Sequence, residues 1–232
     1  GKRIHPKKVG IVSFVDGYHG RTLAASLAAG RPGPGDWIDR KQVNHYQIPL
    51  PFGPRWPWGD LADDPTGERA FAQCIDVLER QSITPDKIAG FIGEPLPGWA
   101  TWPIPHGFAR ALVDWARRHD IVVSFDEVQC GCGRTGRMFG MEHVGVVPDL
   151  FALGKGLSSS LPVSAVVGRK DLLDDPDAGD MSSTHGGNPV CAAAALACLD
   201  VLEDENLVQT SARTGAIDRK STRLNSSHTS IS

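Results

Sequence analysis

Residues 149–168, DLFALGKGLSSSLPVSAVVG, place a single lysine directly after a short apolar run. The run, Leu150–Leu153, has the length of a buried strand, and Lys155 follows it between Gly154 and Gly156. A lysine side chain is normally kept away from a buried strand. The ammonium group therefore either lies in solvent at the strand's end or has a chemical task there.

Apolar runs of strand length recur along the chain and alternate with helical patterns. We predict strands within 9–14, 87–95, 121–129, 148–156 and 162–168, and helices at 66–81, 105–119 and 188–202. Near-continuous apolar strands that alternate with helices are typical of a mostly parallel sheet with helices on both faces. The sequence therefore predicts a three-layer α/β/α fold. The proline- and tryptophan-rich residues 31–60 are expected to form a long irregular segment.

Several polar side chains follow the predicted strands at the point where each strand ends. Glu94, Asp126 and Lys155 each follow or end one apolar run, and Tyr18 and His19 lie in the turn after another. Ligands of open parallel sheets bind beyond the carboxyl ends of the strands. We therefore expect a functional site at this edge of the sheet.

A lysine and an aspartate at neighbouring strand ends suit one particular chemistry. A lysine amine can condense with an aldehyde to form a Schiff base, and pyridoxal phosphate is the usual aldehyde in proteins. That cofactor needs a carboxylate beside its pyridine nitrogen, and Asp126 is of the right type. The alternative is that Asp126 and Glu127 cap a loop while Lys155 is solvated. Spacing alone leaves the two interpretations open.

Two nucleotide-binding motifs are excluded by their surroundings. Residues Gly131–Gly136 match G-x-G-x-x-G, but the five residues Asp126 to Cys130 intervene before the first glycine. The glycine- and proline-containing stretch that follows also makes a poor crossover helix. In residues 153–160, LGKGLSSS, a glycine stands where a phosphate-binding loop has Ser or Thr after its lysine.

The stretch 124–168 closely resembles the signature of the class III pyridoxal-phosphate aminotransferases. Two further blocks, GYHGRT at 17–22 and STHGGNPV at 183–190, match the family in the expected order. The resemblance covers roughly residues 8–205 and implies the large domain of a fold-type I enzyme. It also implies an aminotransferase that moves an amino group from an amino acid or ω-amino donor to a 2-oxo acid. A decarboxylase or aminomutase on the same scaffold, or a non-catalytic homologue, are the alternatives.

The resemblance implies roles for residues around the cofactor. Lys155 would form the Schiff base and later move a proton, and Asp126 would pair with the pyridine nitrogen. Gln129 would approach the phenolic oxygen of the ring. Val128 would pack on one ring face and Tyr18 on the other.

Further roles concern substrate and partner subunit. Thr184 would reach the cofactor phosphate of a neighbouring subunit, which implies a homodimer with a shared active site. Glu94 would lie near the substrate, and Arg21 matches a position that in some members binds a substrate carboxylate. His19 is expected to be structural. The chain departs from the family's usual E-P-x-x-G-x-G-G at 94–103, EPLPGWATWP, which contains Trp99 and Trp102.

Composition bounds the other possibilities. The 232 residues carry a net charge of −3 without a basic cluster, and no run of about 18 apolar residues occurs, so neither nucleic acid nor membrane is expected as a partner. The five cysteines form no C-x-x-C pair and are expected to be structural or incidental thiols, with no metal site. Without a signal peptide, the expected compartment is the cytoplasm.

The domain organisation follows from the resemblance and from the ends of the chain. Residues 1–215 are expected to be the central part of the cofactor-binding large domain, without its N-terminal segment and without the small C-terminal domain. Residues 216–232 are rich in Ser, Thr, Arg and Asn and are expected to be a disordered or artefactual tail. We expect such a fragment to be inactive alone.

Overall fold

The computed structural model describes residues 6–30, 43–51, 57, 64, 66–99, 103–177 and 179–228. The strands are β1 (Gly10–Phe14), β2 (His45–Ile48), β3 (Ile88–Gly93), β4 (Val122–Asp126), β5 (Leu150–Leu153) and β6 (Ala165–Gly168). The α-helices are α1 (Leu23–Ala28), α2 (Glu68–Arg80), α3 (His106–Arg118), α4 (Met141–Val144), α5 (Lys170–Leu173), α6 (Pro189–Asp204) and α7 (Leu207–His228). The described residues also form the short 3-10 helices η2 (Pro85–Lys87) and η3 (Lys155–Leu157).

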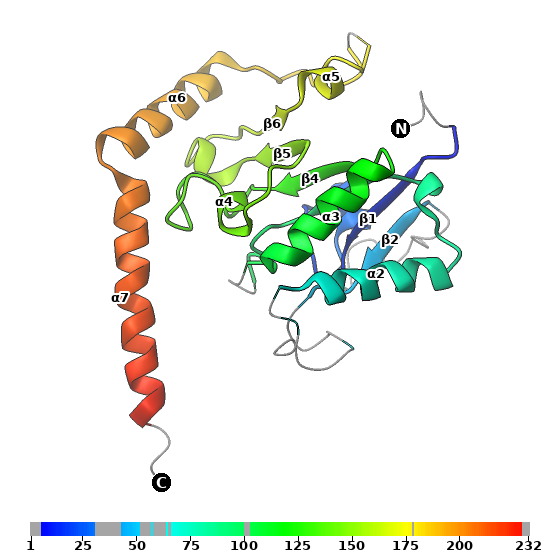
Figure 1. Ribbon diagram of the computed structural model, residues 1–232. Coiled ribbons are helices and arrows are strands. Elements are labelled where there is room, and N and C mark those ends of the chain that lie inside the picture. Colours follow the sequence, from blue (N-terminus) through cyan, green and yellow to red (C-terminus); the bar gives the residue numbers. More distant parts are fainter. Residues whose placement is uncertain are drawn as a thin grey trace.

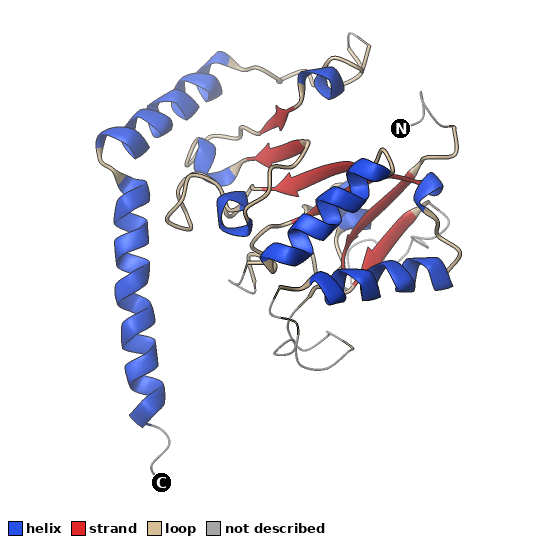
Figure 2. Ribbon diagram, in the orientation of Figure 1, coloured by secondary structure: helices blue, strands red, loops and turns tan. Residues whose placement is uncertain are grey.

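The strands form one sheet in the order β2-β1-β3-β4-β5-β6 (Figures 1 and 2). Strands β1 to β5 are parallel to their neighbours, and only β6 is antiparallel to β5. The short connection from Leu153 to Ala165 explains that exception, because a parallel return needs a longer crossover. The prediction of an α/β fold with a mostly parallel sheet is confirmed.

Strand β2 lies inside the segment that the sequence predicts to be irregular, and that part of the prediction is wrong. It pairs parallel with β1, with Val12 opposite Tyr46 and Phe14 opposite Ile48. The strand has only four residues and is followed by prolines, so its own pattern is too short to stand out. It becomes a strand because β1 offers it a hydrogen-bonding edge.

Helices α2 and α3 lie side by side on one face of the sheet (Figure 1). Their apolar side chains recur every three or four residues, as the sequence predicts, and meet the sheet in an aromatic cluster. The ring of Phe108 lies 5.8 Å from that of Phe14 and 5.4 Å from that of Phe71. This packing fixes β1 and β3, whose carboxyl ends lead into the candidate site.

Helices α6 and α7 lead away from the sheet (Figure 1). The Asn188 side chain caps α6 by accepting hydrogen bonds from the backbone N–H groups of Val190 and Cys191, and α6 has no buried residue. Helix α7 continues to His228, through most of the stretch for which the sequence predicts a tail without regular structure. No glycine or proline occurs from 216 to 228, so nothing in the backbone interrupts the helix.

In the part of the chain that the structure describes, none of the helices has both the length and the apolar character needed to cross a membrane.

The aromatic cluster provides a test of the fold. Phe108 is fully buried, so Phe108→Ala should lower the free energy of unfolding by roughly 3–5 kcal/mol through lost burial and the cavity left behind. Urea unfolding followed by circular dichroism measures this change. Val147→Ala, at an exposed position, is the control and should change stability by no more than about 0.5 kcal/mol. Equal effects of the two changes would contradict the packing described.

Candidate active site

The candidate site lies where the carboxyl ends of four neighbouring parallel strands meet. The turn after β1 carries Tyr18 and His19, β3 is followed by Glu94, β4 ends at Asp126, and Lys155 follows β5. Because β1, β3, β4 and β5 are adjacent and parallel, their ends reach the same edge of the sheet. Residues that are far apart in the sequence are brought together in this way.

Asp126 is a buried carboxylate with two defined partners. Its Oδ1 accepts a hydrogen bond from the backbone N–H of Val128 at 3.0 Å, and its Oδ2 accepts one from His19 Nδ1 at 2.8 Å. The His19 side chain is 2% exposed, and its Nε2 has no hydrogen-bond partner among the described residues. The sequence predicts a structural role for His19, whereas the structure places its ring directly against Asp126.

The neighbouring acid, Glu127, has a different environment. Its side chain is buried and accepts hydrogen bonds from the backbone N–H groups of Gly140 and Met141, each at 2.7 Å. The Cys130 thiol also donates to Glu127, at 3.1 Å. Glu127 therefore caps the start of α4 and closes the loop that precedes it. The loop-capping interpretation holds for Glu127, whereas Asp126 contacts both the backbone of Val128 and the His19 ring.

The glycine pattern at 131–136 lies within this closed loop. The next helix, α4, has four residues and begins only at Met141, so no long helix opens on the glycines. A dinucleotide-binding turn requires such a helix directly after its strand. The structure agrees with the sequence analysis in excluding that function for this stretch.

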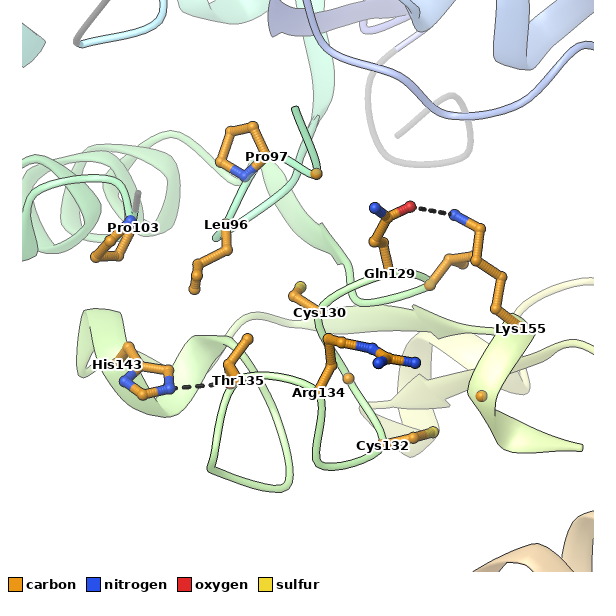
Figure 3. Close-up of a pocket in the computed structure, with 14 residues that line it drawn as sticks. Leu96, Pro97, Pro103, Gln129, Cys130, Cys132, Arg134, Thr135, His143 and Lys155 are labelled. Carbon is orange, nitrogen blue, oxygen red and sulfur yellow. Dashed lines mark hydrogen bonds between the residues drawn. The ribbon is translucent and has the colours of Figure 1, made fainter. Parts of the chain in front are cut away.

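Lys155 begins η3 in a left-handed backbone conformation with a φ of 42°. Its Nζ donates a hydrogen bond to Gln129 Oε1 at 2.7 Å (Figure 3). A Cβ atom at Gly154 would lie 3.3 Å from Val128 Cγ1, and one at Gly156 would lie 3.2 Å from Cys132 Cβ. The two glycines therefore let the lysine turn pack closely on the loop after β4. The ammonium group is exposed, but it is held at the site.

Gln129 lies between two cavities. One has a volume of about 820 Å³ and is lined by Val128, Gln129, Lys155 and the loop that carries Arg134 (Figure 3). The other has a volume of about 360 Å³ and is lined by Tyr18, Arg21, Glu94, Gly98, Trp99 and Gln129. Gln129 thus lines both the cavity that contains the lysine and the cavity that contains the expected substrate-binding residues.

Glu94 connects the turns that follow β1 and β3. Its carboxylate accepts hydrogen bonds from the backbone N–H of Tyr18 at 3.2 Å and from that of Gly98 at 3.0 Å. Burial raises the pKa of the Glu94 carboxyl, and these two hydrogen bonds oppose that rise only in part. The carboxyl therefore takes up a proton more readily than an exposed glutamate.

The remaining predicted residues lie at the rim. Val128 is half-buried beside Gly154, and Arg21 is exposed at the smaller cavity. Thr184 is exposed in the turn before α6 and lines neither of the two cavities. Its predicted role, toward a neighbouring subunit, stays a prediction.

The comparisons with known proteins point to a single family. The family model described as Aminotransferase class-III matches residues 1–230. A 4-aminobutyrate aminotransferase of Mycobacterium leprae (strain TN) is 38% identical over 211 residues, which are 89% of this chain and 47% of that protein. An acetylornithine aminotransferase of Methanopyrus kandleri is 34% identical over 207 residues, again 89% of this chain and 47% of that protein.

A solved structure agrees with these relatives. The thermostable (S)-enantioselective omega-transaminase from Thermomicrobium roseum superposes with a TM-score of 0.79 at 31% identity, over 93% of this chain and 49% of that one. The chain therefore spans about half the length of the relatives that it matches.

The raised pKa of Glu94 generates a prediction about pH. The folded protein binds the Glu94 proton more tightly than the unfolded chain does, so this carboxyl destabilises the fold progressively as pH rises through its folded pKa. Glu94→Gln removes that dependence. Between pH 7 and pH 4, the wild type should therefore gain stability relative to Glu94→Gln, as measured by urea unfolding at each pH. A difference that stays constant, or that changes in the opposite direction, would contradict the environment described for Glu94.

Proposed function

The chain belongs to the class-III aminotransferase family, and from that premise we propose that the protein moves an amino group from an amino acid or ω-amino donor to a 2-oxo acid. The proposed cofactor is pyridoxal 5'-phosphate. The observation that carries the proposal is the pairing of Lys155 Nζ with Gln129 at the mouth of a cavity, next to the strand that ends in buried Asp126.

The side chains present fit that cofactor. A primary amine, a buried carboxylate and an amide lie on adjacent turns, and the cavity beside them, about 820 Å³, has room for a small-molecule cofactor. When bound, pyridoxal phosphate supplies an aldehyde that condenses with amines and a ring that takes up the electron pair of the broken bond. The protein's own groups then have to hold the ring and move protons.

Lys155 is the group that holds the cofactor and moves the proton. Its amine must be neutral to react, and its exposed position lets the side chain swing between the cofactor and the solvent. In this structure, Gln129 Oε1 accepts a hydrogen bond from Lys155 Nζ and so orients the amine. With cofactor and amino donor bound, the Lys155 amine would be the base that takes up a proton from the donor and later gives it back. General acid–base work of this kind contributes roughly 10²- to 10⁴-fold.

Asp126 would hold the pyridine nitrogen of the bound cofactor in its protonated form. Its negative charge favours the protonated ring, and hydrogen bonds from His19 and the backbone of Val128 fix the direction of the carboxylate. His19 is therefore a positioning residue, because it orients the Asp126 carboxylate. The flanking side chains of Tyr18 and Val128 are proposed to hold the two ring faces.

Substrate, partner and compartment complete the proposal. Arg21 and Glu94 line the smaller cavity and are proposed to meet the substrate, because a guanidinium suits a carboxylate. Thr184, exposed at the turn before α6, is proposed to complete the site of a second copy in a homodimer. The cytoplasm is the proposed compartment, since the five cysteines are all free.

The central test is the lysine. The full-length protein, incubated with pyridoxal phosphate and then reduced with borohydride, should retain the cofactor on the peptide that contains Lys155, as seen by mass spectrometry. Lys155→Ala should retain none and should transfer amino groups at least about 10²-fold more slowly. Lys170→Ala, which changes an exposed lysine on α5, is the control and should behave as wild type.

Two outcomes would contradict the proposal. Attachment of the cofactor elsewhere would remove Lys155 from its role. Release of carbon dioxide from the donor, in place of amino transfer to a 2-oxo acid, would show a decarboxylase on the same scaffold.

A further inference from the structure

Two segments approach Cys132, which lies in the loop that follows β4. A Cβ atom at Gly156 would lie 3.2 Å from Cys132 Cβ and 4.0 Å from its Sγ, so the backbone of the lysine turn passes directly against this side chain. A Cβ atom at Gly133, the next residue, would lie 3.6 Å from Leu202 Cδ2 of α6. Helix α6 also contacts η3, the turn that begins at Lys155. Cys132 therefore lies where the loop, the lysine turn and α6 meet.

A second cysteine, Cys198, lies near Cys132 on α6. Cys198 precedes Leu202 by four residues, so the two side chains lie on the same face of this helix. Because Leu202 packs against Gly133, that face of α6 is turned toward the loop. Burial raises the pKa of the Cys132 thiol, and the nearby Glu127 and Cys198 raise it further. The two thiols are therefore close enough to act on each other.

The other cysteines are less suited to pair with these two. Cys191 lies two turns before Cys198 on the same helix, about 10 Å along its axis, which is too far for a disulfide between them. Cys130 is buried, and its thiol donates a hydrogen bond to a neighbouring carboxylate. Cys74 is buried in the core. The five thiols are all free in the structure, and Cys132 with Cys198 is the pair that the packing favours.

Both thiols are accessible to a small molecule. Cys132 lines the cavity of about 820 Å³ that also contains Lys155, and Figure 3 shows both side chains in that cavity. Cys132 and Cys198 are each only half-buried, whereas Cys74 and Cys130 are buried. A dissolved oxidant of low molecular weight therefore reaches this pair before it reaches the thiols of the core.

We propose that Cys132 and Cys198 are a modification site, where a small-molecule disulfide converts the two thiols into a reversible protein disulfide that slows the reaction of Lys155 with the cofactor's aldehyde. Formation of the bond is independent of the proposed function, and its effect on Lys155 rests on that function. In reducing compartments, protein disulfides are usually transient and respond to redox conditions.

The reaction balances in two exchange steps. One cysteine thiolate attacks a sulfur of glutathione disulfide, which forms a mixed disulfide and releases one glutathione. The other cysteine thiolate then attacks the protein sulfur of the mixed disulfide and releases the second glutathione. The two thiol protons and the two electrons that the protein loses end on the two glutathione molecules. An excess of a reducing thiol reverses both steps.

The new bond acts on Lys155 through the packing that the two turns share. A disulfide holds its two Cβ atoms about 3.5–4.5 Å apart, so Cys132 becomes tied to α6 directly beside Gly156. Lys155 has a φ of 42°, a conformation that an L residue keeps only where its surroundings hold it. A changed support for this turn moves the amine relative to Gln129, and a misplacement of about 1 Å can cost a reacting group roughly 10²-fold in rate.

The first test maps the disulfide in the full-length protein. After incubation with glutathione disulfide, alkylation of the remaining thiols and digestion without reduction, mass spectrometry should find the peptides of Cys132 and Cys198 joined. Dithiothreitol should separate them again. Cys198→Ala should abolish the joined peptides, and the matched control Cys191→Ala, on the same helix, should retain them. No linkage, or a linkage of Cys132 to a different cysteine, would overturn the inference.

The second test follows Lys155. When pyridoxal phosphate is added, the Schiff-base absorbance should appear at least about fivefold more slowly in oxidised wild type than in reduced wild type. In Cys198→Ala, treatment with glutathione disulfide should leave the rate unchanged, and thermal unfolding shows beforehand that this variant is folded. Equal rates in oxidised and reduced wild type would overturn the inference. If reduced wild type forms no Schiff base while the first test finds the joined peptides, the proposed function fails and the disulfide stands.

Discussion

The parallel alignment of β1, β3, β4 and β5 is the constraint on which the rest of the structure depends. It brings the ends of four strands to one edge, so that His19 from the first turn can donate a hydrogen bond to Asp126 at the end of the third strand in this row. That 2.8 Å contact joins residues 107 positions apart. The aromatic cluster beneath α2 and α3 holds the sheet in this register. The geometry of the site therefore depends on the packing of the core.

Asp126 and Glu127 are adjacent in the sequence but have different partners in the structure. Glu127 turns inward and satisfies the first N–H groups at α4, which closes the loop. Asp126 instead accepts hydrogen bonds from His19 and from the backbone of Val128. In this closed loop, Gln129 accepts a hydrogen bond from Lys155. Gly154 and Gly156, which flank the lysine, allow its turn to pack closely against the loop. A buried structural acid thus supports the placement of the proposed reactive amine.

Much of the architecture could be predicted from local pattern. The strand that ends at Asp126, the strand before Lys155 and the helix from His106 all have periodicities that tertiary contacts reinforce. Strand β2 could not be predicted, because four residues gain their strand conformation only from pairing with β1. The contact between His19 and Asp126 was also missed, since nothing in the Y-H-G-R-T block says which way the imidazole turns. Helix α7 was not among the predicted helices, and its residues up to His228 form a helix because no glycine or proline follows Gly215 to interrupt it.

By itself, the sequence determined the α/β class, the family resemblance and the identity of the lysine and aspartate at the strand ends. These depend on residue type and on spacing along the chain, which the sequence contains in full. Only the tertiary structure decided which acid caps α4, which side chain contacts Asp126, and that Trp99 donates a hydrogen bond to Asp16. Those facts depend on the direction of side chains and on contacts between distant residues. Both are set by how the strands align and by how the loops close on one another.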